Sequence, residues 1–228
     1  MYPFKKIFLS FLFILISFLG CNSTQKSTQE IPSQEKYALH ENISATYFWV
    51  GEGASDENGY IDNFASAWDE QWMQHYGGID NPYNRNGYLP ADFTPLENPF
   101  YIALPYNDLD EDGNQKKEVK DILPWYDANL SKNISQCKNR WVKITLLSNN
   151  KTVYAQWEDV GPFQTDDKNY VFGSSNPINT INNNAGIDVS PAVRTYLNMQ
   201  DIDSVSWRFV DTEDVPDGPW KQIITIRK

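Results

Sequence analysis

The stretch from Trp141 to Met199 constrains the fold of this chain more than any other part of it. It begins with two apolar runs rich in β-branched and aromatic residues, at positions 141–147 and 152–157. The four residues between them, Ser-Asn-Asn-Lys, are typical of a turn. Two strand-like runs joined by so short a turn predict a β-hairpin.

Two carboxylates lie in or after strand-like runs of this stretch. Asp159 comes directly after the hairpin, ahead of the Val-Gly-Pro-Phe turn at 160–163. Asp188 lies in a further apolar run, Gly-Ile-Asp-Val-Ser-Pro-Ala-Val, at 186–193. A long loop separates the two acids, and such an arrangement can bring both of them to one cleft.

The remaining periodic segments predict short strands and two helices. Apolar residues at every fourth position, together with Asn63 as a cap, predict a helix over 63–76. Ser190 followed by Pro191 predicts the start of a second helix that ends near Asn198. Further strands are expected at 44–50, 98–105, near 186, 204–211 and 221–227. Many short strands, short helices and long loops predict a mainly β fold, a small closed barrel.

The N-terminus has the pattern of an export signal. Lys5 and Lys6 precede an apolar run that is too short to span a membrane, and the run ends in Leu-Gly-Cys at Cys21. This resembles a bacterial lipoprotein signal over 1–20, with Cys21 bearing a palmitate-type anchor; an ordinary secretory signal with an incidental Cys21 is the alternative. Residues 21–36 predict a flexible tether, and 37–228 a single domain. The expected location is the cell envelope of a bacterium, at the outer membrane.

Charge and the scarcity of cysteine and histidine exclude several functions. The signal takes two lysines with it, so 17 basic residues face 30 acidic ones and the net charge is −13. An excess of acids this large argues against nucleic acid or an anionic lipid surface as a partner. Cys137 alone remains after Cys21, so no internal disulfide is expected, and with two histidines in the chain a zinc site is not expected. No phosphate-loop or dinucleotide motif is present, and we expect no required cofactor.

Asp188 is the stronger candidate for chemistry. Its apolar neighbours predict a desolvated carboxyl with a raised pKa, which is what a general acid needs. The alternative role, a helix cap ahead of Pro191, is already filled by Ser190. Asp159 could contribute to the same cleft, or it could only hydrogen-bond the backbone of its own turn.

The hairpin, the Asp159 turn and the Ile-Asp-Val-Ser-Pro-Ala segment around Asp188 together resemble the rare lipoprotein A (RlpA) family. That family has a six-stranded double-psi β-barrel, which expansins and family 45 endoglucanases share. The resemblance implies that Asp188 stands at the catalytic aspartate and Asp159 at the acid of the turn. This chain departs from the pattern in two places: residues 98–107 hold no histidine, and the loop over 163–185 is long.

The resemblance implies a glycan as the partner, with peptidoglycan or a related polysaccharide as the substrate. A hydrolase would need a second acid near the first strand, for which Glu52 or Asp56 fits only loosely, and inverting hydrolysis needs two carboxyls set wide enough for water. A lytic transglycosylase of the MltA type needs one acid, because the sugar's own hydroxyl attacks the anomeric carbon. The alternative is a non-catalytic, expansin-like module that only binds a glycan. A weaker alternative is an envelope scaffold that binds a protein.

Aromatic residues are abundant enough to form sugar-stacking platforms. The chain has eight Trp and 13 Tyr, and flat rings suit sugar faces. Trp49, Trp157 and Phe163 are expected to bind substrate, although core packing is the alternative for each Trp. A separate acidic run resembles the first half of a calcium loop and predicts a structural Ca²⁺ held by Asp108, Asp110 and Asp112 together with Glu118 or Asp121. A solvated acidic turn is the alternative there.

Overall fold

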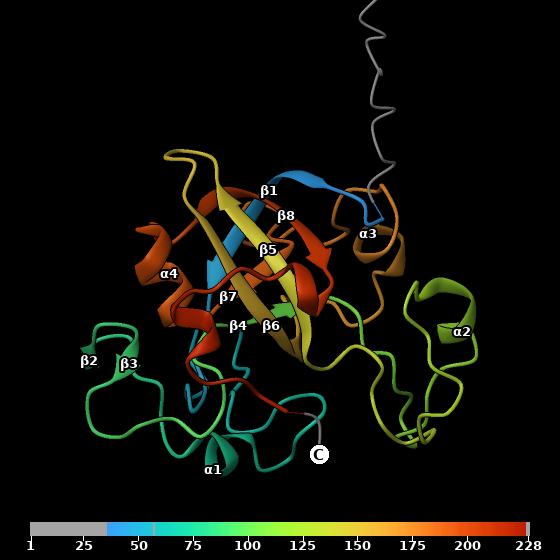
Figure 1. The fold of residues 1–228 in the computed structure, drawn as a ribbon, viewed down its shortest axis with the longest axis horizontal. Helices are drawn as coiled ribbons and strands as arrows, with labels where there is room; N and C mark the ends of the chain where they lie inside the picture. Colours follow the sequence, from blue (N-terminus) through green and yellow to red (C-terminus); the bar gives the residue numbers. More distant parts are fainter. Residues whose placement is uncertain (1–35, 57, 227–228) are drawn as a thin grey trace, which may run out of the picture. The chain divides into compact units, whose positions relative to one another are not determined.

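Six strands close into a barrel in the computed structural model, which describes residues 36–56 and 58–226 (Figure 1). The strand order around the barrel is β1-β7-β4-β6-β5-β8. The strands are β1 His40–Tyr47, β4 Tyr101–Leu104, β5 Arg140–Leu146, β6 Thr152–Val160, β7 Ile187–Val189 and β8 Asp203–Val210. The prediction of a mainly β fold with a closed six-stranded barrel is therefore confirmed.

The barrel combines parallel and antiparallel pairs. β1 runs parallel to β7, and β4 runs parallel to β6. The other four neighbouring pairs are antiparallel, including the predicted β5–β6 hairpin. Residues of alternate positions fill the interior, with Ile102, Ile187 and Trp157 among its fully buried side chains.

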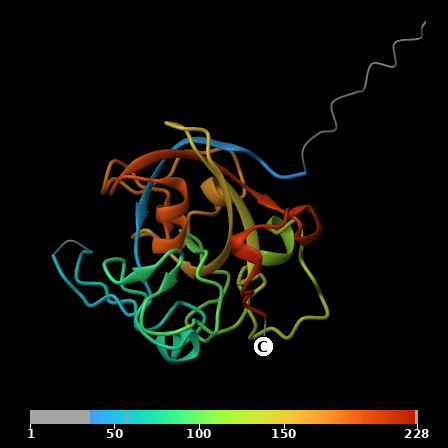
Figure 2. The same cartoon turned by 60° about the vertical axis from the view of Figure 1, so that its left-hand side comes forward.

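Short elements surround the barrel. The helices are α1 Trp72–Tyr76, α2 Val119–Ile122, α3 Lys168–Val171 and α4 Pro191–Leu197, with single 3₁₀ turns at Thr212–Asp214 and Pro219–Lys221. A small hairpin pairs β2 Arg85–Asn86 with β3 Leu89–Pro90. Figure 1 shows α1 below the barrel, this hairpin at its lower left and α2 out to the right, and α1 is again at the bottom in the turned view of Figure 2. No helix of the described residues is long and apolar enough to cross a membrane.

The helix α4 forms as its sequence predicts. Ser190 accepts a hydrogen bond from the backbone N–H of Val193, and Pro191 occupies the first turn. Asn198 ends the helix in a left-handed conformation, with φ of 59°. The Ser190 hydroxyl also donates to the carbonyl of Pro99, so the cap ties the helix to the segment just ahead of β4.

The predicted helix over 63–76 is wrong except for its last turn, α1. Ser66 pairs with Asp69 as an isolated bridge, and the backbone N–H of Ala67 donates to the Asp159 carboxylate at 2.8 Å. An N–H bound to a distant side chain is lost to the helical ladder. Asn63 likewise donates its side-chain amide to Glu52 at 2.9 Å.

The strand predicted over 221–227 does not form in its described residues. Thr225 exchanges hydrogen bonds of 2.9 Å with the Gln156 side chain, through both its N–H and its C=O. Asn98 also donates its side-chain amide to Gln156 and its backbone N–H to the Thr225 hydroxyl. Side-chain amides thus satisfy the backbone where a neighbouring strand would otherwise have done so.

The export signal, Cys21 and residues 21–35 lie outside the described residues. Cys137 is a buried free thiol.

Candidate functional site

Four residues on four neighbouring strands form one row across the outer face of the barrel. Thr46 of β1 pairs with Asp188 of β7, which pairs with Ala103 of β4, which pairs with Asp159 of β6. Side chains at directly paired positions point to the same face of a sheet. Ile187 and Val189 fill the interior, so Asp188 between them faces outward.

A β-bulge at Glu158 gives Asp159 its direction. Ile102 pairs with Trp157, but the next residue, Ala103, pairs with Asp159, so Glu158 is an extra residue on β6. Without the bulge, the alternation that buries Trp157 would turn Asp159 into the barrel. The bulge therefore places Asp159 on the same face as Asp188.

Ala103 lies between the two acids, and its small side chain leaves space above it. Adjacent strands are ~4.8 Å apart, so the Asp159 and Asp188 backbones, two strands apart, are separated by about 10 Å. A methyl group in place of a Gly161 hydrogen would lie 3.7 Å from Asp188 Oδ2 and 3.8 Å from Ala103 Cβ. Gly161 therefore leaves open the space in front of the Asp188 carboxyl.

These acids lie in a cleft of about 370 Å³, which we call the Asp188 cleft. The structure therefore brings together the two acids that the sequence singled out. The other described residues of the cleft comprise acids, amides and aromatic side chains, which include Glu52, Asp201, Asn58, Asn63, Asn182, Tyr47, Trp49, Tyr83 and Phe163.

The Asp188 carboxyl is set up to hold a proton near neutral pH. Burial raises its pKa to about 7, while the Thr46 hydroxyl, which donates to Oδ1, opposes the rise. The neighbouring carboxylates of Glu52 and Asp159 add to the rise, because each disfavours a further negative charge. The expectation of a desolvated acid with a raised pKa thus agrees with the structure.

Asp159 has a structural task as well as a place in the cleft. Burial raises its pKa to about 6, although the backbone N–H groups of Ala67 and Val160 favour the charged form. The hydrogen bond from Ala67 fixes the loop ahead of α1. The alternative, that Asp159 hydrogen-bonds only the backbone of its own turn, is incomplete. Asp159 also accepts a hydrogen bond from the N–H of Ala67, which lies 92 residues earlier in the chain.

The three aromatic residues predicted to bind substrate lie in different places. Trp49 and Phe163 line the Asp188 cleft, as expected of substrate-binding rings. Phe163 has φ of 56°, a left-handed backbone conformation that bulky residues rarely adopt. Trp157 is wrong as a platform, because it is 0% exposed and its indole N–H donates to the carbonyl of Asp159 inside the barrel.

Sequence reasoning missed the other aromatic side chains of the cleft. The Tyr47 and Trp49 rings are stacked at 6.0 Å between centroids, and the Tyr83 ring meets Trp49 edge-on at 6.5 Å. Tyr83 comes from the loop that the sequence left without a role, and it is largely exposed. The only signal was its position in an ordered, Asn- and Pro-rich loop, where binding residues are common.

Glu52 is the acid that the sequence placed only loosely. It follows the first strand in a glycine-rich loop, and the fold brings it near enough to Asp188 to raise the pKa of that carboxyl. Its Oε2 accepts the Asn63 side-chain amide at 2.9 Å. Asp56, the other acid considered there, instead accepts a hydrogen bond from the Tyr60 hydroxyl.

The residues predicted to bind calcium make separate hydrogen bonds and ion pairs in the structure. Asp108 is fully buried and accepts hydrogen bonds from the Ser135 hydroxyl and the Gln136 N–H. Asp110 Oδ1 accepts from the N–H groups of Asp112 and Asn114, as in a tight turn. Glu118 pairs with Lys168 at 3.3 Å. Within 36–56 and 58–226, no group of three His, Cys, Asp or Glu side chains could hold a metal ion. Calcium binding stays a prediction.

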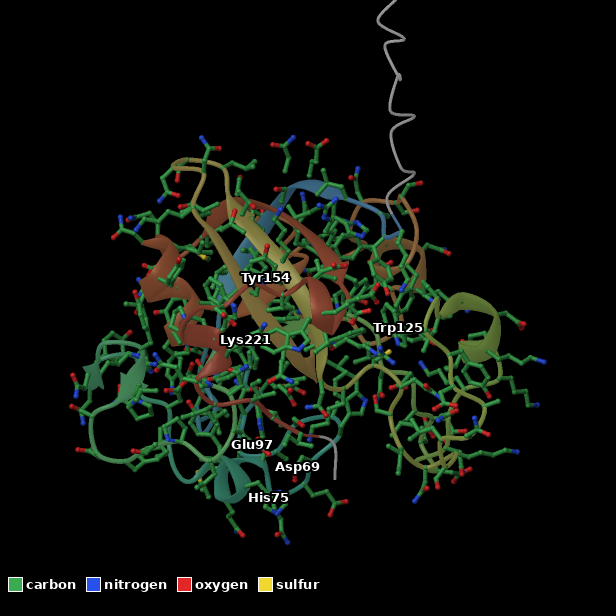
Figure 3. All side chains as sticks on the ribbon, in the orientation of Figure 1. Asp69, His75, Glu97, Trp125, Tyr154 and Lys221 are labelled. Atoms are coloured by element: carbon green, nitrogen blue, oxygen red, sulfur yellow. The ribbon has the colours of Figure 1, made fainter. Side chains whose placement is uncertain are left out.

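A second cleft of about 290 Å³ lies beside α1. Figure 3 shows Asp69, His75 and Glu97 close together there. The His75 Nδ1 lies 2.7 Å from Asp69 Oδ2, and Lys138 lies 3.8 Å from the same oxygen. The Asp69–His75 pair helps to hold the loop whose Ala67 N–H binds Asp159.

Comparisons with known proteins add little to this geometry. No protein-family model matches the chain, and no curated protein matches it. Among solved structures, the Streptomyces papain inhibitor (SPI) matches with 14% sequence identity and a TM-score of 0.29. The match covers 76% of this chain and 96% of that one. A likeness this weak supports no argument about function, so the barrel assignment is based on the strand pairing itself.

Proposed function

We propose that this protein acts on a glycan in the Asp188 cleft, with Asp188 as the general acid of a lytic-transglycosylase-like reaction. The observation that carries the proposal is the row Thr46–Asp188–Ala103–Asp159 at the floor of an open cleft. A carboxyl that stays protonated near pH 7 can donate that proton to a leaving group.

The proposed reaction needs one acid and no added water. Asp188 protonates the glycosidic oxygen as the bond to the anomeric carbon breaks. A hydroxyl of the same sugar attacks that carbon and closes an anhydro ring. The proton of this hydroxyl passes to a carboxylate, for which the ionised form of Asp188 is placed, and the acid is thereby restored.

The side chains around Asp188 fit this task. The Thr46 hydroxyl donates to one carboxyl oxygen, which fixes the orientation of the group, while Gly161 leaves the other oxygen accessible from the cleft. Tyr47, Trp49, Tyr83 and Phe163 offer rings on which sugar faces can stack.

We further propose that the barrel is of the double-psi, RlpA type and that the protein is lipid-anchored through Cys21 at the outer membrane. Peptidoglycan is then the nearest polysaccharide. The support is the order of the hairpin, the Asp159 turn and the Asp188 segment in the sequence, together with the two parallel strand pairs of the barrel.

The test is product analysis with purified peptidoglycan and related polysaccharides. Wild-type protein should release soluble fragments with anhydro ends, and Asp188→Asn should lower the rate by roughly 10²–10⁴. Asn keeps an acceptor for the Thr46 hydroxyl but cannot supply the acid proton. Glu213→Gln, which removes an exposed acid outside the cleft, is the matched control. New reducing ends in place of anhydro ends would show that the reaction is hydrolysis and not transglycosylation.

A non-catalytic glycan-binding module is the second candidate. Two observations favour it: residues 98–107 hold no histidine, and the engagement of Asp159 with the Ala67 N–H argues against a two-acid hydrolase. Co-sedimentation of the protein with insoluble polysaccharide, without any new ends, would establish this function and refute the enzyme.

A further inference from the structure

The charges of the Asp188 cleft carry an inference about its substrate. The described residues that line it include four acids, Glu52, Asp159, Asp188 and Asp201, and no Lys, Arg or His. A ligand that enters this cleft therefore meets carboxyl groups on several sides and no cation from the described lining.

One described cation near the cleft is already engaged, and a second, Lys138, acts on Asp159 from outside the lining. Arg194 of α4 donates from Nη2 to Asp201 Oδ1 at 2.7 Å, and its guanidinium lies 4.4 Å from the centre of the Tyr47 ring. Arg194 thus offsets the charge of Asp201, so that at neutral pH the carboxylates of Glu52 and Asp159, with the ionised fraction of Asp188, supply the negative charge of the cleft.

The acids of the cleft repel one another electrostatically, and they would repel additional negative charge in the same way. Glu52 and Asp159 both raise the pKa of Asp188, in addition to the effect of burial. A carboxylate on a bound sugar would occupy the same space and meet the same repulsion, in surroundings that screen it less than bulk water does.

Uncharged groups supply the remaining polar contacts. Asn182 lines the cleft from a turn in which Asn182, Asn183 and Asn184 have φ values of 49°, 58° and 60°. Asn is the residue, after Gly, that best tolerates this left-handed backbone. Side-chain amides at the rim can bind sugar hydroxyl or acetamido groups without adding charge.

We propose that the cleft selects glycans with neutral or amino-bearing sugars and rejects sugars with free carboxylates, such as uronic acids. This inference rests on the proposed glycan function and narrows its substrate class. Glu52 is the specificity-determining residue, since it lines the cleft from the loop after β1 and lies outside the row itself.

The experiment measures binding of three soluble oligosaccharides of equal length to the full-length protein. The probes are oligomers of N-acetylglucosamine, of glucosamine and of glucuronic acid, titrated by calorimetry at about 20 mM and about 0.5 M salt. We expect the anionic oligomer to bind at least about tenfold more weakly than the neutral one at low salt, with the gap narrowing at high salt.

Two charge-matched variants locate the effect. Glu52→Gln should narrow the gap between the neutral and the anionic oligomer several-fold, whereas Glu213→Gln removes the same charge from an exposed site and should leave the gap unchanged. Anionic binding as tight as neutral binding, or equal effects of both variants, would overturn the inference and leave the glycan function standing. Failure of all three oligomers to bind would refute the glycan function and the inference with it.

Discussion

Glu158 offers a test of the structure that needs no substrate. The bulge leaves this glutamate 1% exposed, with Oε1 accepting the Asn139 side-chain amide at 2.7 Å and Oε2 buried without a hydrogen-bond partner. Burial raises the pKa of the carboxyl from 4.5 to about 8. We predict that Glu158→Gln changes the pH dependence of the unfolding free energy.

The sign follows from where the proton is bound. Between about pH 4.5 and about pH 8 the folded protein keeps the Glu158 proton and the unfolded chain has lost it. The unfolding free energy therefore falls as pH rises, by ~1.4 kcal/mol per pH unit for this one group, on the order of 5 kcal/mol over the window. The buried acids Asp159 and Asp188 act in the same direction, but only up to their pKa values of about 6 and about 7. The interval from pH 7 to 8 therefore isolates Glu158 among these three.

The replacement is chosen to remove the proton and keep the shape. Gln retains the oxygen that accepts the Asn139 amide, and it places an NH₂ group where Oε2 now lies. Leaving that group without an acceptor would cost roughly 1–3 kcal/mol at every pH. The slope with pH is therefore the diagnostic quantity, and the absolute stability is not.

The assay is urea unfolding followed by tryptophan fluorescence from about pH 5 to about pH 8.5. Wild-type stability should fall by about 1 kcal/mol between pH 7 and 8, and Glu158→Gln should remove that fall. Asp188→Asn, the matched control, should reduce the slope of the curve below pH 7, where Glu158 still acts, and leave most of the fall above pH 7. Parallel curves for wild type and Glu158→Gln would refute the buried, bulged position of Glu158.

Three further predictions test the core and the cleft. Trp157→Ala should lower the unfolding free energy by about 3–5 kcal/mol in the same assay, because the ring fills the barrel; a loss under about 1 kcal/mol would contradict this. Asp80→Ala should cost about 3–5 kcal/mol, since it leaves the buried Arg85 guanidinium without the carboxylate to which it donates; wild-type stability would argue against that pair. If Asp188 is the acid, the rate of glycan cleavage should fall as pH rises through about 7, and a rate that keeps rising there would count against it.

Local patterns in the sequence predicted the elements whose partners are close along the chain. The β5–β6 hairpin follows from two β-branched runs around a short turn, and α4 follows from Ser190 and Pro191. Asp188 could be singled out because its neighbours, Ile187 and Val189, are apolar and fix the face on which it lies. These features depend on residues within a few positions of one another, and the sequence shows such residues directly.

Contacts between distant residues decided the rest of the site. The first turns of the expected helix over 63–76 are lost because the Asp159 carboxylate takes the Ala67 N–H. The expected C-terminal strand is absent from the described residues because Gln156 binds both backbone groups of Thr225. No local propensity can anticipate such competition for a backbone group, since the competing side chain lies far away in the chain.

Local sequence patterns were enough to predict a β-hairpin, a capped helix and an acid in apolar surroundings, because hydrophobic period and capping are local properties. The folded structure was needed to show that Asp159, Ala103, Asp188 and Thr46 share one row. That row depends on one extra residue in β6, the bulge at Glu158, and on the register between strands far apart in sequence. Because side chains alternate along a strand, a change of one residue in register would have turned the same acid into the core.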